Sequence, residues 1–353
     1  DDTPEPDKTS KPADTSEPDE TPAPAKTPAP PRLPVQTRTS EPEKRPVLIK
    51  TPTKAPAPME TPELVKTPEP AKTPAPTSTP VPDKEVKIFT DGNEITIGES
   101  VTQLKNDFGE PARIDKTGYN YDYYIYNSDY SKFAMVAVTD GEVSGVYTDA
   151  TDFSYETLNA SSEIEDVNLL FDKSYSLTKT LSLNSDGYAY TICFDTLGTQ
   201  KITGIQVLKT SAAKKTGNPS GTQELENLSL EVWDLTNSIR ARNGIATLEW
   251  SDTAAGTAKA HSADMAAKNY FDHTNLEGLS PFDRMENAGI KYYTAAENII
   301  AGQSTSIGAA NGWFNSAGHR KNMLEDSLTY LGVGFAYNTD SIYRYYGTQN
   351  FYS

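Results

Sequence analysis

The chain has 353 residues, a formal net charge of −17 at pH 7, three histidines and one cysteine. This acidic balance argues against nucleic acid as a partner, because a polyanion needs a basic surface to displace its counterions. No run of about 18 apolar residues occurs, which argues against a membrane span. Because Cys193 is alone, neither a disulfide framework nor a thiolate metal cluster is expected, and its "YTICFD" setting indicates an inert core thiol.

Residues 1–84 contain 22 of the 25 prolines and no glycine, in runs such as "TPAPAKTPAPP" and "KTPEPAKTPAPTSTP". Proline fixes φ and removes a backbone donor, so such a tract favours solvated polyproline II over a packed core. We therefore expect a disordered Pro/Thr-rich stalk. The first residues, "DDTPEP", contain no signal peptide and are interpreted as a mature or trimmed end. A Pro/Thr stalk with almost no Cys indicates an extracellular, secreted or cell-wall-associated bacterial protein.

Residues 85–210 are expected to form a smaller α+β domain. In "EITIGESVTQLKNDFGEPARI" a strand precedes a helix that Ser100 caps and Gly109 ends. Asp140 and Gly141 separate two alternating segments and predict a two-residue hairpin, whose turn needs positive φ.

The same order recurs roughly 60 residues later. "SEIEDVNLLFD" predicts a helix, and "GYAYTICFD" with "QKITGIQVLKT" predicts a hairpin, so the domain is interpreted as two helix-hairpin repeats. It is rich in Tyr but has no His, no Trp and no clustered carboxylates. We interpret it as an accessory packing or binding module.

Residues 211–222 are rich in Gly, Ser and Thr and are interpreted as a linker. Residues 223–353 hold every His and Trp. Their first helix is predicted from an apolar stripe beginning "LENLSLEVWDL", and Ser251 caps a second, Ala-rich helix. "SPFDRMENAG" and "SIGAANGWFNS" are further helix candidates, and "LGVGFAYN" with "YRYYGTQNFYS" predicts a final hairpin. Helices around an antiparallel sheet indicate an α+β sandwich.

The histidines have different settings. His261 lies on the apolar stripe of the second helix, which favours a core role over a ligand role. His273 begins an irregular segment, and His319 is placed in a turn of "SAGHRKN". Glu297 in "TAAENII" has apolar neighbours and needs a partner if it is buried. The two imidazoles could satisfy it around one cleft, although their spacing is not a local metal signature.

The last domain resembles the CAP superfamily, the cysteine-rich secretory, antigen 5 and pathogenesis-related proteins, in its bacterial SCP-like branch. The matching segments are "NSIRARNGIATLEWSDTAAGTAKAHSADMAAKNYFDH", "AENI", "GWFNSAGHRKNML" and "LGVGFAY". "IGESVTQLKNDFGEP" and "VTDGEVSGVYT" are similar to the CAP-associated domain that precedes CAP in some bacterial proteins. The resemblance implies an α-β-α sandwich with a cleft lined by a His-Glu-Glu-His tetrad.

Carried over by motif, three members of the tetrad fall on His273, Glu297 and His319. Ser316 stands where the second Glu is expected, and Ala296 replaces the usual Gly before Glu297. The disulfides of eukaryotic relatives are absent as well. These departures leave a three-membered site with a hydroxyl in the fourth place.

Two functions follow, and both use the same residues. In the first, His273, Glu297 and His319 hold Zn²⁺ or another divalent cation, with an open position that could support envelope hydrolysis of a protease-like kind. The replaced Glu removes the obvious general base, and no nucleophile-base pair is visible.

The second function, which we prefer, is a binding module for a cell-envelope component such as a wall polymer, lipid or protein. Ser316, Arg320, Asn322 and Asn298 are expected to line its cleft, although Arg320 and Asn322 could equally cap the preceding helix. A structural role, in which the triad only ties loops together, is the remaining alternative.

Overall fold

The computed structural model describes residues 85–216 and 222–353; the predicted stalk and part of the predicted linker lie outside these residues. The described residues belong to one compact unit and combine helices with antiparallel sheet, which confirms the predicted α+β class. Within these residues, no helix is both long enough and apolar enough to cross a bilayer.

The first domain is built on two sheets. The larger has seven strands in the order β3-β4-β5-β6-β11-β10-β9, and the smaller has the order β2-β1-β7-β8. Their bounds are β1 Lys87–Thr90, β2 Asn93–Thr96, β3 Arg113–Lys116, β4 Asp122–Tyr126, β5 Ala134–Thr139, β6 Glu142–Thr148, β7 Ser154–Tyr155, β8 Leu158–Asn159, β9 Thr180–Ser185, β10 Tyr188–Phe194 and β11 Ile202–Lys209. Two helices accompany them, α1 Val101–Phe108 and α2 Ile164–Phe171.

Local sequence signals account for these elements. The Ser100 side chain accepts from the Gln103 backbone N–H, and Gly109 ends α1 at φ 78°, so both predicted caps are confirmed. Asp140 and Gly141 take φ of 51° and 83° between β5 and β6, which confirms the predicted hairpin. Cys193 is buried, and burial raises the pKa of its thiol to about 12.

The strand order of the small sheet is symmetric about its middle, where β2-β1 meets β7-β8. In the large sheet the four strands β3-β4-β5-β6 meet the three strands β11-β10-β9, so one group has a strand more than the other. The predicted repeat stays a prediction.

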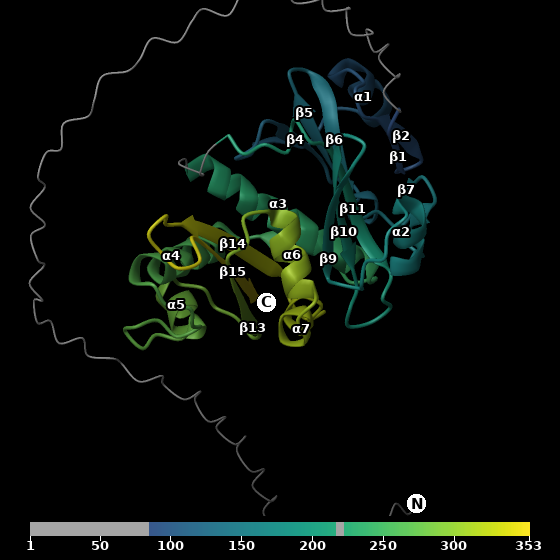
Figure 1. The fold of residues 1–353 in the computed structure, drawn as a ribbon. Helices are drawn as coiled ribbons and strands as arrows, with labels where there is room; N and C mark the ends of the chain where they lie inside the picture. The colour runs from purple at the N-terminus through teal and green to yellow at the C-terminus, as the bar shows by residue number, and fades with distance from the viewer. Residues whose placement is uncertain (1–84, 217–221) are drawn as a thin grey trace, which may run out of the picture. The chain divides into compact units, whose positions relative to one another are not determined.

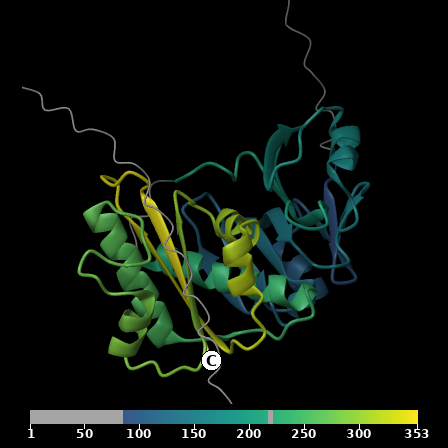
Figure 2. The ribbon, with the colours of Figure 1, turned by 90° about the horizontal axis from the view of Figure 1, so that it is seen from below.

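The second domain has three layers (Figures 1 and 2). A four-stranded sheet of order β12-β14-β15-β13 carries α4 and α5 on one face and α3 and α6 on the other. The bounds are α3 Thr222–Arg242, β12 Glu249–Trp250, α4 Asp252–Lys268, α5 Pro281–Asn287, β13 Ala295–Ala301, α6 Ser306–Phe314, α7 Ala317–Met323, β14 Tyr330–Tyr337 and β15 Tyr345–Tyr352. The predicted α-β-α sandwich is therefore confirmed.

Two glycines explain how closely α4 lies on the sheet. A Cβ on Gly332 would come 2.0 Å from the backbone nitrogen of Ala255, and one on Gly334 would come 2.1 Å from that of Lys259. The "LGVGFAY" strand therefore uses glycine to let the helix backbone approach the sheet.

One prediction of local structure was wrong. His319 was placed in a turn, but it lies in the short helix α7, whose N-cap is Ser316. With one glycine and only Ala317 and Met323 as apolar residues, "SAGHRKNM" gave no helical stripe. The helix is instead held by tertiary contacts, with Met323 buried and Asn322 bonded to β13.

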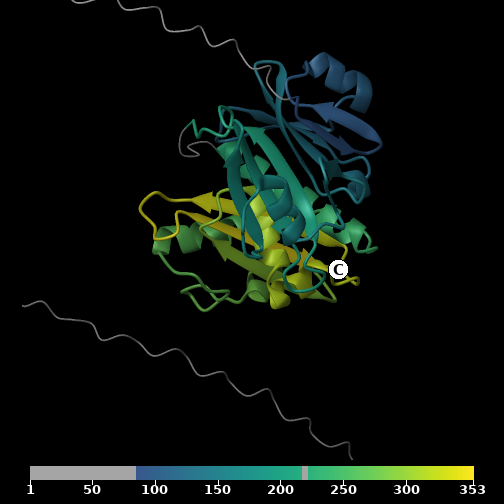
Figure 3. The ribbon, with the colours of Figure 1, turned by 45° about the vertical axis from the view of Figure 1, so that its right-hand side comes forward.

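The helix α3 joins the two domains. One apolar core runs from Tyr123 of the first domain through Val232 of α3 to Trp313 and Phe335 of the second. Figure 3 shows the strands of the large sheet alongside α6, and the Asn311 amide nitrogen of α6 donates to the backbone oxygen of Lys179 next to β9.

A charged network reinforces this joint. The Arg113 guanidinium on β3 donates to Asp115 Oδ1 at 2.6 Å and Oδ2 at 2.8 Å, and to Asp234 Oδ2 on α3 at 2.6 Å. Asn127 and Tyr130 each donate to Asp234 Oδ1 at 2.7 Å. Both carboxylates are sealed from solvent.

Arg113→Met should therefore lower the free energy of unfolding by about 3–5 kcal/mol, since two buried carboxylates lose their cation. Urea unfolding of the full chain measures this loss. Lys116→Met is the matched control, because the Lys116–Asp122 pair on the same strand is exposed and should cost about 1 kcal/mol or less. Equal losses in the two variants would contradict the assigned role of Arg113.

Candidate functional site

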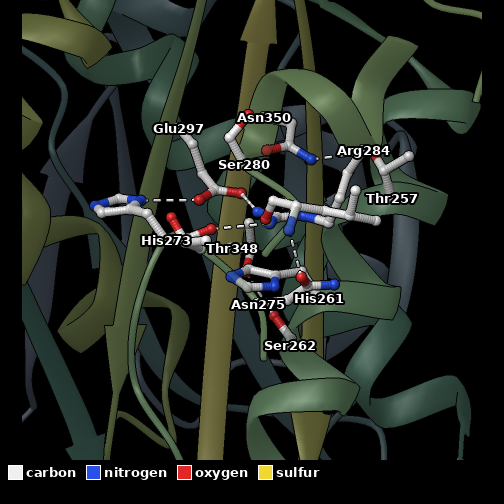
Figure 4. Close-up of polar contacts among 12 residues, drawn as sticks. Thr257, His261, Ser262, His273, Asn275, Ser280, Arg284, Glu297, Thr348 and Asn350 are labelled. Atoms are coloured by element: carbon white, nitrogen blue, oxygen red, sulfur yellow. Dashed lines mark hydrogen bonds and ion pairs between the residues drawn. The ribbon is translucent and has the colours of Figure 1, made fainter. Parts of the chain in front are cut away.

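The site is organised around Glu297 on β13. Its side chain is 1% exposed, and both of its oxygens are engaged. His273 Nδ1 lies 2.8 Å from Oε1, and Arg284 Nη2 lies 2.6 Å from Oε2 (Figure 4). A carboxylate can only accept, so Nδ1 carries the proton in this contact and the second ring nitrogen, Nε2, is left as an acceptor.

A third donor approaches from the neighbouring strand. The β13–β15 register sets Glu297 directly opposite Asn350. With its amide turned so that both atoms are satisfied, Asn350 donates to Glu297 Oε2 at 3.1 Å and accepts from Thr257 Oγ1 and the Ala258 backbone N–H. The buried side chain therefore accepts hydrogen bonds from a cation and two further donors, which offset the cost of its burial.

Arg284 supports His273, the residue that faces solvent, both at its backbone and, through Glu297, at its ring. Its Nη1 donates to the backbone oxygens of His273 at 2.8 Å and Leu279 at 2.9 Å, while Nη2 holds Glu297. The helix α5 that presents it begins with a capping box between Ser280 and Asp283. The His273 loop is therefore fixed through its backbone as well as its ring.

His273 is the exposed member of the set, with 49% of its side chain accessible. It lies in the irregular segment between α4 and α5, as predicted. Large apolar side chains are exposed on the same segment and at the start of α5: Phe271, Leu276, Leu279 and Phe282. We call these four the apolar rim. Exposed apolar side chains therefore lie on the same stretch of chain as the exposed imidazole.

His319 lies near His273 but has no contact with Glu297 in the hydrogen-bond network. Burial lowers the pKa of its ring, and a charge on His273 would lower it further. Its backbone oxygen accepts from the Asn298 side chain at 3.2 Å, which ties α7 to β13. The ring is therefore a neutral nitrogen donor at neutral pH.

His261 has the core position that its helical spacing predicts. It is 1% exposed, and Nε2 lies 3.0 Å from the Asp272 backbone oxygen. Burial lowers the pKa of this ring, and Nδ1 has no hydrogen-bond partner among the described residues.

Three of the four residues predicted to line the cleft, Arg320, Asn322 and Asn298, tie elements together. Arg320 Nε donates to the Phe314 backbone oxygen at 2.5 Å and Nη2 pairs with Asp195 at 2.5 Å, so it caps α6 and contacts the first domain. Asn322 donates to Asn298 Oδ1 at 2.9 Å. Ser316 is the N-cap residue of α7 but makes no side-chain capping bond. The alternative role as helix caps therefore describes Arg320 better than ligand orientation.

The structure does not present His273, Glu297 and His319 as three free ligands for a metal ion. Among the described residues, no group of three or more His, Cys, Asp or Glu side chains is arranged to hold a metal ion. Both oxygens of Glu297 accept hydrogen bonds from His273 and Arg284. In a metal site, a carboxylate placed in this way would orient the His273 imidazole from outside the ligand shell. The predicted three-ligand site stays a prediction.

Sequence reasoning missed Arg284 and Asn350. Arg284 stands in a short helix among charged neighbours and resembles an ordinary surface residue. A signal existed, because an isolated Glu in an apolar strand requires a cation, and arginine forms bidentate and buried pairs more readily than histidine. Asn350 could be found only once the strand register was known.

Comparison with known proteins agrees with this geometry. Residues 233–351 match the family model described as cysteine-rich secretory protein family (CAP), and residues 97–193 match the model for the CAP-associated N-terminal domain. The Bacillus subtilis protein named uncharacterized membrane protein YlbC is 27% identical over 76% of this chain and 85% of its own length. The uncharacterized protein YkwD of the same organism is 43% identical over 34% of this chain and 46% of its own length.

Solved structures show the same architecture. An extracellular protein containing a SCP domain from Bacillus anthracis superposes with a TM-score of 0.61 at 26% identity, covering 72% of this chain and 93% of that one. A cysteine-rich secretory protein from Staphylococcus aureus gives a TM-score of 0.54 at 16% identity, with the same coverage of both chains, and supports the fold alone. Residues 233–351 therefore form a CAP domain of the cysteine-rich secretory protein family, and a region that matches the CAP-associated N-terminal domain precedes it at residues 97–193.

Proposed function

We propose that this protein is a binding module of the bacterial cell envelope, whose CAP domain uses His273 and His319 to hold a divalent metal or a polar group of an envelope component. The proposal rests on one observation, which is that the exposed ring of His273 is held in a fixed position by buried groups. A sealed carboxylate and a buried arginine fix the tautomer and backbone of His273, while its Nε2 edge stays open to solvent.

The apolar rim indicates the nature of the ligand. Phe271, Leu276, Leu279 and Phe282, which lie within nine residues of His273 along the chain, are between 37% and 63% exposed. Exposed apolar groups close to a polar centre are typical of sites that bind amphipathic molecules or proteins. An envelope lipid, a lipid-linked wall component or a membrane-associated protein has this combination.

The location of the protein rests on two supports. The Bacillus anthracis structure that shares both domains is described as an extracellular protein. The Pro/Thr-rich composition of residues 1–84 suits a spacer that would hold the folded domains away from a surface. We therefore place the protein outside the cytoplasm, secreted or attached to the wall.

Binding is favoured over hydrolysis by the state of Glu297. A general base must reach the reacting water, but the Glu297 side chain is only 1% exposed and its oxygens accept from His273 and Arg284. Ser316 has no hydrogen bond to His319 among the described residues, so the pair is not arranged as a nucleophile with its base.

Zinc should bind to the full chain at neutral pH, and Glu297→Gln should weaken it by about 10–100-fold, since a neutral amide holds Nδ1–H less firmly. Isothermal calorimetry measures the affinity. Replacing His273 and His319 together by Ala should abolish the heat. The zinc affinity should also fall as pH drops below about 6.5, because protons compete with the metal for the imidazoles. Because the pKa of His319 is lowered, protonation of this ring should weaken binding only at a lower pH.

The matched control is Glu286→Gln, an exposed carboxylate on α5 that bonds only Tyr292 among the described residues. It should leave the zinc affinity unchanged. Zinc binding that persists in the double His variant would remove the metal-holding part of the proposal.

Stability separates a binding site from a structural tie. His273→Ala should cost about 1 kcal/mol or less, since the ring is half exposed, whereas Glu297→Gln should cost about 3–5 kcal/mol because buried Arg284 loses its anion. Chemical unfolding of the full-chain variants measures both. If His273→Ala costs as much as Glu297→Gln, the ring serves the fold, and the structural role replaces the proposal.

A further inference from the structure

A second candidate site lies away from the histidines, where α3 faces the large sheet of the CAP-associated domain. A cavity of about 210 Å³ opens there, bounded by β3, β4, β10 and β11 on one side and by α3 and the segment 304–307 on the other. Its lining includes the aromatic residues Tyr119, Tyr121, Tyr123 and Tyr345. None of these residues contributes to the His273 site.

The tyrosines form a connected aromatic wall. The rings of Tyr119 and Tyr121 stack with centroids 5.7 Å apart and 15° between their planes. Tyr123 meets Tyr121 edge-on at 4.9 Å. Aromatic faces carry partial negative charge, so a wall of this kind attracts cations.

One cation of the chain already uses this wall. Lys215 Nζ lies 5.7 Å from the ring centroid of Tyr119 and 5.7 Å from that of Tyr345. Its other polar contact is a long hydrogen bond of 3.5 Å to Ser304 Oγ. The ammonium thus sits between two ring faces without a carboxylate partner among the described residues.

Whereas Lys215 lacks a carboxylate partner among the described residues, a buried carboxyl at the cavity lacks a cationic one. Glu231 is 4% exposed, and its only hydrogen bond among the described residues comes from Ser306 Oγ to Oε2 at 2.6 Å. The nearby Arg113 is committed to Asp115 and Asp234. Burial, followed by the charge of Asp115, raises the pKa of Glu231 to about 8. An added positive charge in the cavity would relieve this cost.

Polar groups on the sheet side of the cavity are paired with each other, whereas Glu224 Oε2 on α3 is buried without a hydrogen-bond partner among the described residues. Gln206 Nε2 donates to the Tyr123 hydroxyl at 2.6 Å, and Thr191 Oγ1 donates to Gln206 Oε1 at 3.3 Å. A neutral sugar would need several unengaged donors and acceptors here. The carboxyl groups of Glu231 and Glu224 and the ring faces remain, and all of them favour a cation.

We propose that this cavity binds an alkylammonium group, with Glu231 as its counter-ion, the tyrosine rings as its aromatic wall and Lys215 as an internal competitor for the ring faces. The group would come from a quaternary or a primary amine of a small molecule. The site is independent of the proposed metal or ligand site at His273, so either can fail alone.

The test compares charged probes with uncharged ones of the same shape. Calorimetry on the full chain near pH 9 would use choline against 3,3-dimethylbutanol, and butylammonium against butanol. We expect each cation to bind about tenfold more tightly than its alcohol, and the better of the two cations identifies the amine type. Equal binding of a cation and its alcohol, or no binding of either pair, would overturn the proposal.

Variants assign the roles of the two charged residues. Glu231→Gln should reduce choline affinity about tenfold or more, because the ammonium loses its partner. Lys215→Ala should increase it, because the ring faces become available. Glu226→Gln is the control on the same helix, since Glu226 is exposed and pairs with Lys259, and it should change nothing. An unchanged affinity in Glu231→Gln, with folding confirmed by its unfolding midpoint, would refute the counter-ion role.

The pH dependence of choline affinity is an independent test of the role of Glu231. Choline keeps its charge at every pH, so wild-type affinity should rise between about pH 6 and 9 as Glu231 ionises, and Glu231→Gln should lack this rise. Other charged groups face the carboxyl or line the cavity: Arg113, Asp115, Asp234, Glu224, Lys116 and Lys215. These groups remain in the variant, so a rise that persists in it would come from one of them and would contradict the assignment.

Discussion

The CAP domain depends on one constraint: a carboxylate sealed within the sheet must be fully satisfied. Glu297 is placed by the β13–β15 register opposite Asn350, and only donors brought from outside the strand can complete its needs. Arg284 and His273 come from a helix and a loop outside the sheet, so satisfying Glu297 also ties both of them to β13. The exposed imidazole is held in position because the buried acid requires it.

The helix α3 imposes a similar demand at the joint between the domains. Buried polar side chains on one helix face, Asp234 and Ser238 among them, are satisfied by groups of the CAP-associated domain rather than of their own. Asp149 of the first domain pairs with Arg242 in return. Among the described residues, these buried polar groups find their partners only in the other domain. They therefore stabilise the observed arrangement of the two domains, because separating the domains would break their hydrogen bonds and ion pairs. The two domains are therefore better regarded as one folded unit than as beads on a linker.

The sequence predicted most of the elements because their signals are local. Caps such as Ser100 and Ser251, the Asp140-Gly141 turn and the apolar stripe of α3 depend on neighbouring residues alone. The site was predicted in part: His273 and Glu297 meet, but Arg284, the strongest partner of Glu297, was not foreseen. Helix α7 was missed because its stability comes from Met323 and Asn322 contacting other elements. Partners chosen by register or by packing leave no periodic pattern in the chain.

The two buried glutamates show how the same residue type can serve different ends. Glu297 has an arginine, an imidazole and an amide within reach, so its charge is neutralised internally and its effect is to position other groups. Glu231 has one hydroxyl donor, and its burial raises its pKa to about 8. A fold does not gain stability by keeping such an acid short of a cation, because at neutral pH it must hold a proton that the unfolded chain would release. That cost is understandable where the missing charge is brought by a ligand. A buried carboxylate with several partners inside the protein thus positions the groups around it, whereas one with few such partners can itself bind a charged ligand.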